Sequence, residues 1–364
     1  MGVADVVPLV DQHCHGVATV DVDPREWLSE AKSKRRHPFR SLLGLSVRRW
    51  CSPVLGMHKH APAEEYLWRR AEMGWHEVSQ RLLTAAGVRH WLVDTGYAPG
   101  PVTSPAQLAD LGGGAGHEVL RIEALAEATR ATATGPEALL DRISAHLHTL
   151  PAIAFKSIVG YRTGLGVPGT QPPRDEALRA AAGWLRSAET RLTDPVVLAW
   201  LVHEAARAAA ERGLPLQFHT GFGDTDLRLS AVDPLLLTDF LRVARCPVVL
   251  LHCYPFHRNA AYLAHVFEHV YVDVGLAVPF VGVRAGAVLA EVLELAPFDA
   301  VLYSSDGNVL PELHFLGAVL WRRAVNGLVD AWLADDALTT TDAERLALSI
   351  GSANAARLHR LAGP

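Results

Sequence analysis

Two histidines separated by one residue, His13 and His15, follow an apolar run near the start of the chain. In a strand, residues i and i+2 point to the same face, so both imidazoles can converge on one cation. Neutral imidazole is a common ligand of Zn²⁺ and of similar borderline metals. The pair therefore predicts a metal centre at the end of a strand.

The H-x-H spacing is a weak signal by itself, because it occurs three times. About one occurrence is expected by chance for 18 histidines in 364 residues. His146 and His148 fall on a predicted helix, where positions i and i+2 face apart, so we expect an exposed pair. His58 and His60 fall in an irregular segment and are either close to substrate or merely on the surface. The strand context favours the first pair.

Further side chains of the same chemistry follow other apolar runs. Lys156 follows the fourth run, His219 the fifth, His252 the sixth and Asp306 the eighth. A lone histidine after a strand is more often a satisfied core residue. However, the carboxyl ends of parallel strands meet at one face of a barrel, where active sites form. We therefore expect these residues to join the first histidine pair in one metal site.

Each residue of this set has a chemical role and a structural alternative. Asp306 can accept a proton from water and deliver it to a leaving nitrogen, or it can cap a helix. His252 can bind a second cation or act as an electrophile toward the substrate. Tyr161 and Arg162 lie after Lys156 and are predicted to bind substrate, Arg162 through a carboxylate. An ordinary ion pair is the alternative for Arg162.

The elements that must position these residues alternate between short apolar runs and helical stretches, which is typical of a parallel sheet. Eight runs predict a (β/α)₈ TIM barrel of the α/β class. An open doubly wound sheet is the alternative, but no glycine-rich phosphate loop follows the first run. The runs are Val6–Val10, Trp91–Val93, Val119–Ile122, Ile153–Phe155, Leu214–Phe218, Val248–Leu251, Val270–Val274 and Ala300–Tyr303.

Two connections between the runs are longer than a simple barrel needs. We expect residues 1–364 to form a single barrel domain, with residues 23–65 as an insertion and lid after the first strand. The second long connection joins Phe155 to Leu214. Loops that follow strands lie at the catalytic face, so both segments are placed to cover the site.

Composition limits the classes of partner. Apolar residues make up 49% of the chain, which is typical of a globular protein. The formal net charge is −5, so the chain lacks the excess positive charge that binding to nucleic acid or to anionic membranes requires. The basic run Lys32, Lys34, Arg35 and Arg36 is too short to change this. The four cysteines form no C-x-x-C pair and the N-terminal residues do not resemble a secretory signal, so we expect a cytoplasmic protein. A homo-oligomer remains open.

The order of these residues resembles the metal site of the amidohydrolase superfamily. In that pattern H-x-H follows strand one, lysine strand four, histidine strands five and six, and aspartate strand eight. Several motifs more narrowly resemble the FluG-like or nodulin-like branch of the amidohydrolase 2 group. These motifs are Val119-Leu120-Arg121-Ile122-Glu123, Phe155-Lys156-Ser157-Ile158, Tyr161-Arg162-Thr163-Gly164-Leu165, Gln217-Phe218-His219-Thr220-Gly221-Phe222-Gly223-Asp224 and Ser304-Ser305-Asp306.

The resemblance implies a metal-dependent hydrolase that cleaves a C–N bond of a small, carboxylate-bearing molecule. The same barrel also supports a metal-dependent decarboxylase, which is the alternative reaction. A third reading is a binding protein without catalysis. The expected cofactor is a divalent metal, Zn²⁺ first and Mn²⁺ second, as one or two ions.

The chemical state of Lys156 determines whether the site binds one metal ion or two. A lysine buried beside cations favours the neutral amine, which can add CO₂ to form a carbamate. Carboxylated Lys156 would bridge two ions, one held by His13, His15 and Asp306 and the other by His219 and His252. The rival is an ordinary ammonium that binds a substrate carboxylate above a single ion.

Overall fold

The computed structural model describes residues 2–31 and 37–362, which include every predicted site residue. The basic run Lys32, Lys34, Arg35 and Arg36 lies outside the described residues. Within the described ranges, no helix combines the length and apolar character that a membrane span requires.

The centre of the fold is a parallel sheet, in which the seven strands of the described chain lie side by side in sequence order. Short runs of buried aliphatic residues form these strands, as expected for a sheet covered on both faces. The strands are β1 (Leu9–Cys14), β2 (Val88–Asp94), β3 (Ala115–Arg121), β4 (Ala154–Ser157), β5 (Leu216–His219), β6 (Val248–Leu251) and β7 (Val270–Val272).

An eighth extended segment closes the sheet into a barrel. On one side, Val301 forms a parallel bridge with Val272 of β7, and the N–H of Leu302 donates to the carbonyl of Val272 at 2.9 Å. On the other side, the N–H of Gln12 in β1 donates to the carbonyl of Tyr303 at 3.2 Å. The predicted (β/α)₈ barrel is therefore confirmed, with an eighth segment too briefly paired to be a regular strand.

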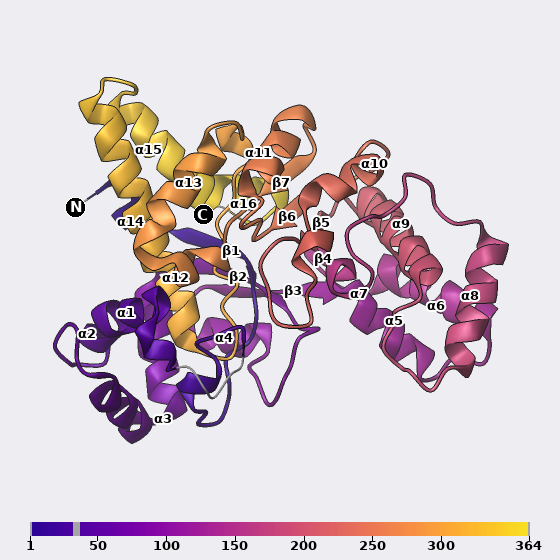
Figure 1. Cartoon of the computed structure of the whole chain (residues 1–364), viewed down its shortest axis with the longest axis horizontal. Coiled ribbons are helices and arrows are strands. Elements are labelled where there is room, and N and C mark those ends of the chain that lie inside the picture. The colour runs from indigo at the N-terminus through magenta and orange to yellow at the C-terminus, as the bar shows by residue number, and fades with distance from the viewer. Residues whose placement is uncertain (1, 32–36, 363–364) are drawn as a thin grey trace.

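Helices follow the strands and surround the sheet (Figure 1). In that view, α1 to α3 gather at one side of the molecule, and α5, α6 and α8 gather at the other. The helices are α1 (Leu42–Ser46), α2 (Ser52–Val54), α3 (Ala63–Ala86), α4 (Pro105–Gly112), α5 (Ile122–Arg130), α6 (Pro136–Thr149), α7 (Val159–Arg162), α8 (Arg174–Arg186), α9 (Pro195–Arg212), α10 (Thr238–Leu241), α11 (His257–Val266), α12 (Ala277–Val281), α13 (Ala285–Leu293), α14 (Pro311–Ala334), α15 (Thr340–Leu348) and α16 (Asn354–Leu358).

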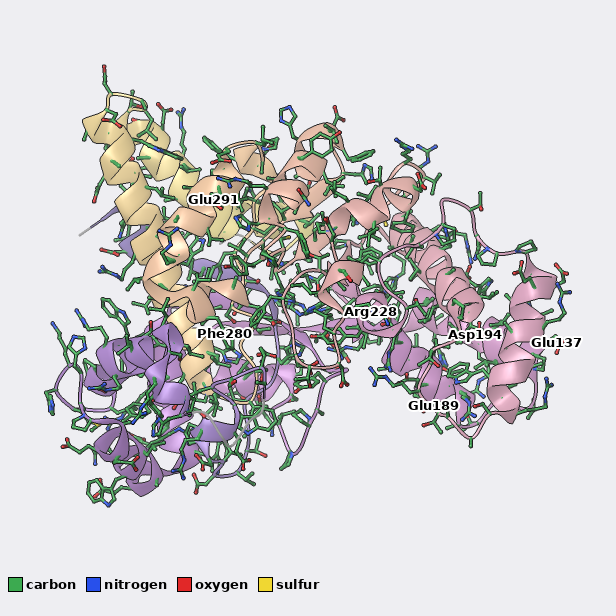
Figure 2. The ribbon with its side chains drawn as sticks, viewed as in Figure 1. Glu137, Glu189, Asp194, Arg228, Phe280 and Glu291 are labelled. Carbon is green, nitrogen blue, oxygen red and sulfur yellow. The ribbon has the colours of Figure 1, made fainter. Side chains whose placement is uncertain are left out.

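Local capping residues set the ends of α9. The carboxylate of Asp194, labelled in Figure 2, accepts hydrogen bonds from two backbone N–H groups of the first turn. Gly213 ends the helix in the left-handed region, with φ of 64°. Asp233 caps the 3₁₀ turn Pro234–Leu237 in the same way, and the short α10 follows this turn.

The first strand differs from the predicted run Val6–Val10. Val3–Val6 forms a 3₁₀ turn, and β1 continues through polar residues as far as Cys14. This extension is stable because the buried polar side chains have partners. The carboxylate of Asp11 accepts from the N–H and the hydroxyl of Ser305 at 2.9 and 2.5 Å. His13 consequently lies inside the strand rather than after it.

Two apolar clusters stabilise the barrel. The larger cluster fills the space between the sheet and the helices. The smaller one consists of side chains from the strands together with Ala355 and Leu358 of α16. The strand residues of this interior cluster are Val10, Leu92, Val119, Ala154, Val249, Leu251 and Leu302.

The segment after β1 is anchored to the barrel by a buried ion pair. Residues 23–65 include the turn Pro24–Glu26, α1, α2 and the start of α3. Farther along α3, the guanidinium of Arg70 and the hydroxyl of Tyr66 donate to Glu312 of α14 at 2.7 and 2.9 Å. Removing one partner of such a buried pair is strongly destabilising, so this contact fixes the segment against the barrel.

Candidate metal centre

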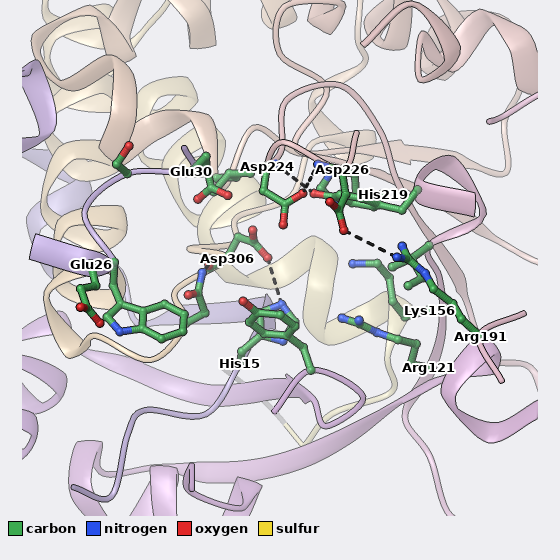
Figure 3. Close-up of a pocket in the computed structure, with 17 residues that line it drawn as sticks. His15, Glu26, Glu30, Arg121, Lys156, Arg191, His219, Asp224, Asp226 and Asp306 are labelled. Atoms are coloured by element: carbon green, nitrogen blue, oxygen red, sulfur yellow. Dashed lines mark hydrogen bonds and ion pairs between the residues drawn. The ribbon is translucent and has the colours of Figure 1, made fainter. Parts of the chain in front are cut away.

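The predicted site residues meet at the carboxyl ends of the strands. His13 lies on β1 and Lys156 on β4, and His219 ends β5. His252 follows β6, and Asp306 follows the eighth segment. Figure 3 shows Lys156, His219 and Asp306 beside His15, which comes directly after β1. All six side chains are buried, so any charge among them needs a partner.

Asp306 is the centre of this group. Its Oδ1 atom lies 3.3 Å from Nε2 of His13 and 3.4 Å from Nε2 of His15. Its Oδ2 atom lies 3.8 Å from Nε2 of His252. Asp306 and His252 both have positive φ, 49° and 69°, a conformation that costs energy for residues other than glycine. Such strain clusters at functional sites, where surrounding contacts hold it in place.

The donor set fits a cation. Nδ1 of His15 lies 3.0 Å from the carbonyl of Asp94, which can only accept, so His15 carries its proton there and directs the lone pair of Nε2 toward Asp306. Among the described residues, neither ring nitrogen of His252 has a hydrogen-bond partner, and nor does Oδ1 of Asp306. Buried acceptors that converge without a donor are costly, and a metal ion satisfies them.

The protonation states agree with this interpretation. Burial lowers the pKa of His13 to about 4, reinforced by the charge of Lys156. Burial also lowers the pKa of His252 to about 3, although Asp306 opposes the shift. Burial favours the neutral carboxyl of Asp306, but His252, His13 and His15 hold its pKa well below the usual range. Neutral imidazoles and an ionised carboxylate are the forms that bind a divalent cation.

Two groups of three residues could each hold a metal ion, because the ligand atoms within each group lie within 4.8 Å of one another. The two groups share His13. One is His13, His252 and Asp306, and the other is His13, His15 and Asp94. The carboxylate of Asp94 is already occupied, because its Oδ2 accepts from Nε and Nη2 of Arg121 at 3.0 and 2.6 Å. Burial opposes the charge of Asp94, but this guanidinium holds its pKa far below the usual range. Asp306, rather than Asp94, is therefore the carboxylate available to a cation beside His13, His15 and His252.

Lys156 and His219 complete the interior of the site. Nζ of Lys156 lies 2.9 Å from Nε2 of His13, and burial lowers the pKa of the lysine to about 8. The ring of His219 packs against those of Tyr161 and His252, with centroids 4.6 and 4.5 Å apart. Its Nε2 lies 3.1 Å from the carbonyl of Phe222, in the loop after β5. His219 therefore lies at the site, but this nitrogen is engaged by the backbone.

A cavity of about 280 Å³ opens above these residues. Tyr161 lines it, as predicted for a substrate-binding residue. Arg162 is not among the residues that line it, and its Nη2 atom donates to Glu127 at 2.9 Å instead. Two arginines that sequence reasoning missed, Arg121 and Arg191, do line the cavity (Figure 3). Arg121 could have been suspected, because it ends β3 as Lys156 and His219 mark the ends of β4 and β5.

The segment predicted as a lid contributes directly to the cavity. Glu26, Trp27, Ser29 and Glu30 line it from the insertion after β1. Asp224 and Asp226 line it from the loop after β5, together with residues of the barrel. The cavity is therefore walled by both signs of charge.

Other polar residues near these elements have structural surroundings of their own. No helix of the described chain begins at Asp306, since α14 starts at Pro311. His146 and His148 lie on α6 as predicted, but both are half-buried rather than exposed, because His146 contacts the hydroxyl of Thr129 and His148 pairs with Glu211 at 3.0 Å. Cys14 and Cys253 lie in the apolar cluster outside the sheet. Glu123, in the first turn of α5, accepts from the hydroxyl of Ser157 and from the N–H of Ile158, and so supports the end of β4.

Comparison with known proteins agrees with this geometry. Residues 136–361 match the amidohydrolase family of the amidohydrolase 2 group, and the chain belongs to that family. Protein fluG of Emericella nidulans is 34% identical over 221 residues, which are 57% of this chain and 26% of fluG. The matched part is thus about a quarter of that longer relative. The resemblance to FluG read from the motifs is confirmed.

Solved structures extend the comparison to the whole chain. A provisionally assigned metal-dependent hydrolase of Lactobacillus casei superposes with a TM-score of 0.88 and 27% identity, over 98% of this chain and 96% of that protein. A uronate isomerase of Thermotoga maritima superposes with a TM-score of 0.63 at 14% identity, over 98% and 95% of the two chains. The second likeness concerns the fold alone. The family and the buried ligand set together indicate an enzyme that depends on a divalent metal.

Proposed function

We propose that the protein is a hydrolase that cleaves an amide-like C–N bond in a small molecule carrying a carboxylate. The observation that carries this proposal is the convergence of buried, unsatisfied acceptors on His252 and Asp306 beside a cavity of about 280 Å³. His13, His15 and Asp306 would hold the metal, with His252 beside them. A bound Zn²⁺, or Mn²⁺ as the second choice, would activate water and polarise the scissile carbonyl.

The chain's own residues supply proton transfer. Oδ1 of Asp306 faces His13 and His15, so Oδ2 is the oxygen that would take the proton of the attacking water. The same oxygen would then return the proton to the leaving nitrogen. His252 lies 3.8 Å from Oδ2 and is placed to orient either this carboxylate or the substrate carbonyl.

The cations of the cavity wall suit a substrate carboxylate. The ion pair of Arg121 with Asp94 uses Nε and Nη2, which leaves Nη1 outside that pair. We propose that Arg121 takes the role that the sequence suggested for Arg162, with Tyr161 also lining the cavity. Residues 23–65 would act as the lid, because four of their side chains already line the cavity.

We propose one ion per chain and an unmodified Lys156. Engagement of His219 by the carbonyl of Phe222 removes one ligand that a second ion would need. The alternative, a carboxylated Lys156 that bridges two ions, requires His219 to leave that carbonyl. Metal analysis together with intact-protein mass spectrometry separates them. Two ions per chain and the added mass of a carboxylate would favour the bridged form.

The function is tested by assaying metal-reconstituted protein against N-acyl amino acids and, as matched controls, their methyl esters. The proposal expects release of the amine from the free acid and much slower turnover of the ester. Release of CO₂ without an amine would replace the hydrolase by the decarboxylase. Binding of the acids without any turnover, at full metal content, would favour the non-catalytic reading.

A further inference from the structure

Below the predicted ligands lies a continuous chain of hydrogen bonds between buried side chains. Nδ1 of His13 lies 2.9 Å from Oε1 of Gln217 on β5. Nε2 of Gln217 lies 2.9 Å from both the carbonyl and the Oε1 atom of Gln12 on β1. The amide of Gln12 in turn contacts the carboxylate of Asp273, which follows β7. All four side chains are at most 1% exposed.

The direction of every bond in this chain is fixed. The backbone carbonyl of Gln12 can only accept, so Gln217 must present its NH₂ group to it. The carboxylate of Asp273 also accepts, so Gln12 must turn its own NH₂ group there and its oxygen toward Gln217. Two independent acceptors therefore impose the same orientation on both amides. The oxygen of Gln217 is left facing His13.

We infer that Gln217 is a positioning residue that forces the proton of His13 onto Nδ1 and so prepares Nε2 as a metal ligand. An acceptor opposite Nδ1 excludes the tautomer in which Nε2 carries the proton. The lone pair of Nε2 then faces Asp306 at 3.3 Å and Nζ of Lys156 at 2.9 Å. His15 reaches the same tautomer through a backbone carbonyl, whereas His13 depends on this side chain.

The same chain of hydrogen bonds connects β1 with the segment that follows β6. The second oxygen of the Asp273 carboxylate accepts from the N–H of His252 at 2.9 Å and from that of Gly275 at 3.0 Å. The carboxylate that orients Gln12 therefore also holds the backbone of His252. Ring orientation at β1 and backbone position after β6 are set by one anchor, so the two histidines are positioned together.

The test begins with the wild-type protein. Metal-free protein labelled with ¹⁵N-histidine reports which ring nitrogen of His13 carries the proton, and His13→Gln identifies the resonance. The inference expects the Nδ1–H form. Observation of the Nε2–H form would overturn it whatever the variants do. This measurement needs neither metal nor substrate, so it can succeed where the proposed hydrolase activity fails.

Variants then measure the consequence for the metal. Gln217→Leu should weaken Co²⁺ or Zn²⁺ binding about 10–100-fold and shift His13 away from the Nδ1–H form. Gln217→Glu retains an acceptor for Nδ1 and should keep the tautomer. Gln171→Leu is the matched control, since Gln171 is exposed in the segment between α7 and α8, where its Nε2 donates to the carbonyl of Trp200 on α9 at 3.4 Å. Unchanged tautomer and metal affinity in Gln217→Leu would overturn the inference.

Discussion

The two ends of the barrel interior are built from the same strands but have opposite chemistry. Farther from the carboxyl ends of the strands, Leu92, Val119 and Ala154 form part of the smaller apolar cluster. Two residues farther along the same strands stand Asp94, Arg121 and Lys156, at the carboxyl ends. Because residues i and i+2 share a face, each strand supplies an apolar support and then a functional group directly above it. In each of these three strands, the buried apolar residue that stabilises the fold and the polar residue at the site are therefore only two positions apart.

This separation predicts that substitutions at the two ends affect different measurements. The strongest expected effect is at His13. His13→Ala should remove bound metal and abolish turnover, because the ring faces Asp306 and Lys156 from the centre of the ligand set. The fold should persist, since the apolar end remains intact. Metal analysis and circular dichroism check this. Full metal content with normal turnover would contradict the assignment.

Asp306→Asn gives the next largest effect. An amide can still lie beside the histidines, but it cannot accept a proton at neutral pH. The turnover number should therefore fall about 10²–10⁴-fold when metal is restored to the wild-type level. Steady-state kinetics on the reconstituted variant measures this fall. A turnover number equal to that of the wild type would remove Asp306 from proton transfer.

Arg121 and Arg162 form a matched pair for mutagenesis. Arg121→Lys keeps a charge in the cavity wall but loses the planar fork, so KM should rise about tenfold or more for a carboxylate substrate. Arg162→Lys should leave KM unchanged, because Arg162 pairs with Glu127 and does not line the cavity. Equal effects on KM would show that Arg162 also reaches substrate, as the sequence suggested.

The smallest effect on catalysis is expected at the apolar end. Leu92→Ala should lower the free energy of unfolding by about 2–5 kcal/mol, because it opens a void in the interior cluster. The turnover number should stay near the wild-type value at a temperature where the variant is folded. Thermal denaturation and kinetics on one preparation measure both quantities. A large loss of turnover without loss of stability would show that the two ends are coupled.

The sequence alone was sufficient to predict where a residue lies when that residue stands at or just after the end of a strand. His219, His252 and Asp306 each follow a buried apolar run, so barrel topology brings them together without knowledge of rotamers. The family resemblance pointed to the same residues and to the same fold. Which of these side chains bind the metal stays a prediction, because no donor-to-metal distance follows from topology.

Other features depend on pairing that sequence periodicity does not encode. The first strand extends past Val10 because Asp11 and Gln12 find buried partners on Ser305 and Asp273, more than 250 residues away. Arg121 ends β3 and Arg162 ends α7, the short helix after β4, but the sequence does not show that Arg121 pairs with Asp94 and lines the cavity whereas Arg162 pairs with Glu127 and does not. Such choices arise from tertiary contacts.

The closure of the barrel determines when the site can exist during synthesis. Ser305 binds Asp11 across a sequence separation of 294 residues, and the N–H of Asp306 donates to the carbonyl of His13 at 3.1 Å. A growing chain therefore holds its first two histidines for most of its translation before their carboxylate partner is made. Contacts this distant in sequence form late in folding. We expect metal uptake to be one of the last folding events, and a nascent chain that stops before Asp306 to bind the ion weakly.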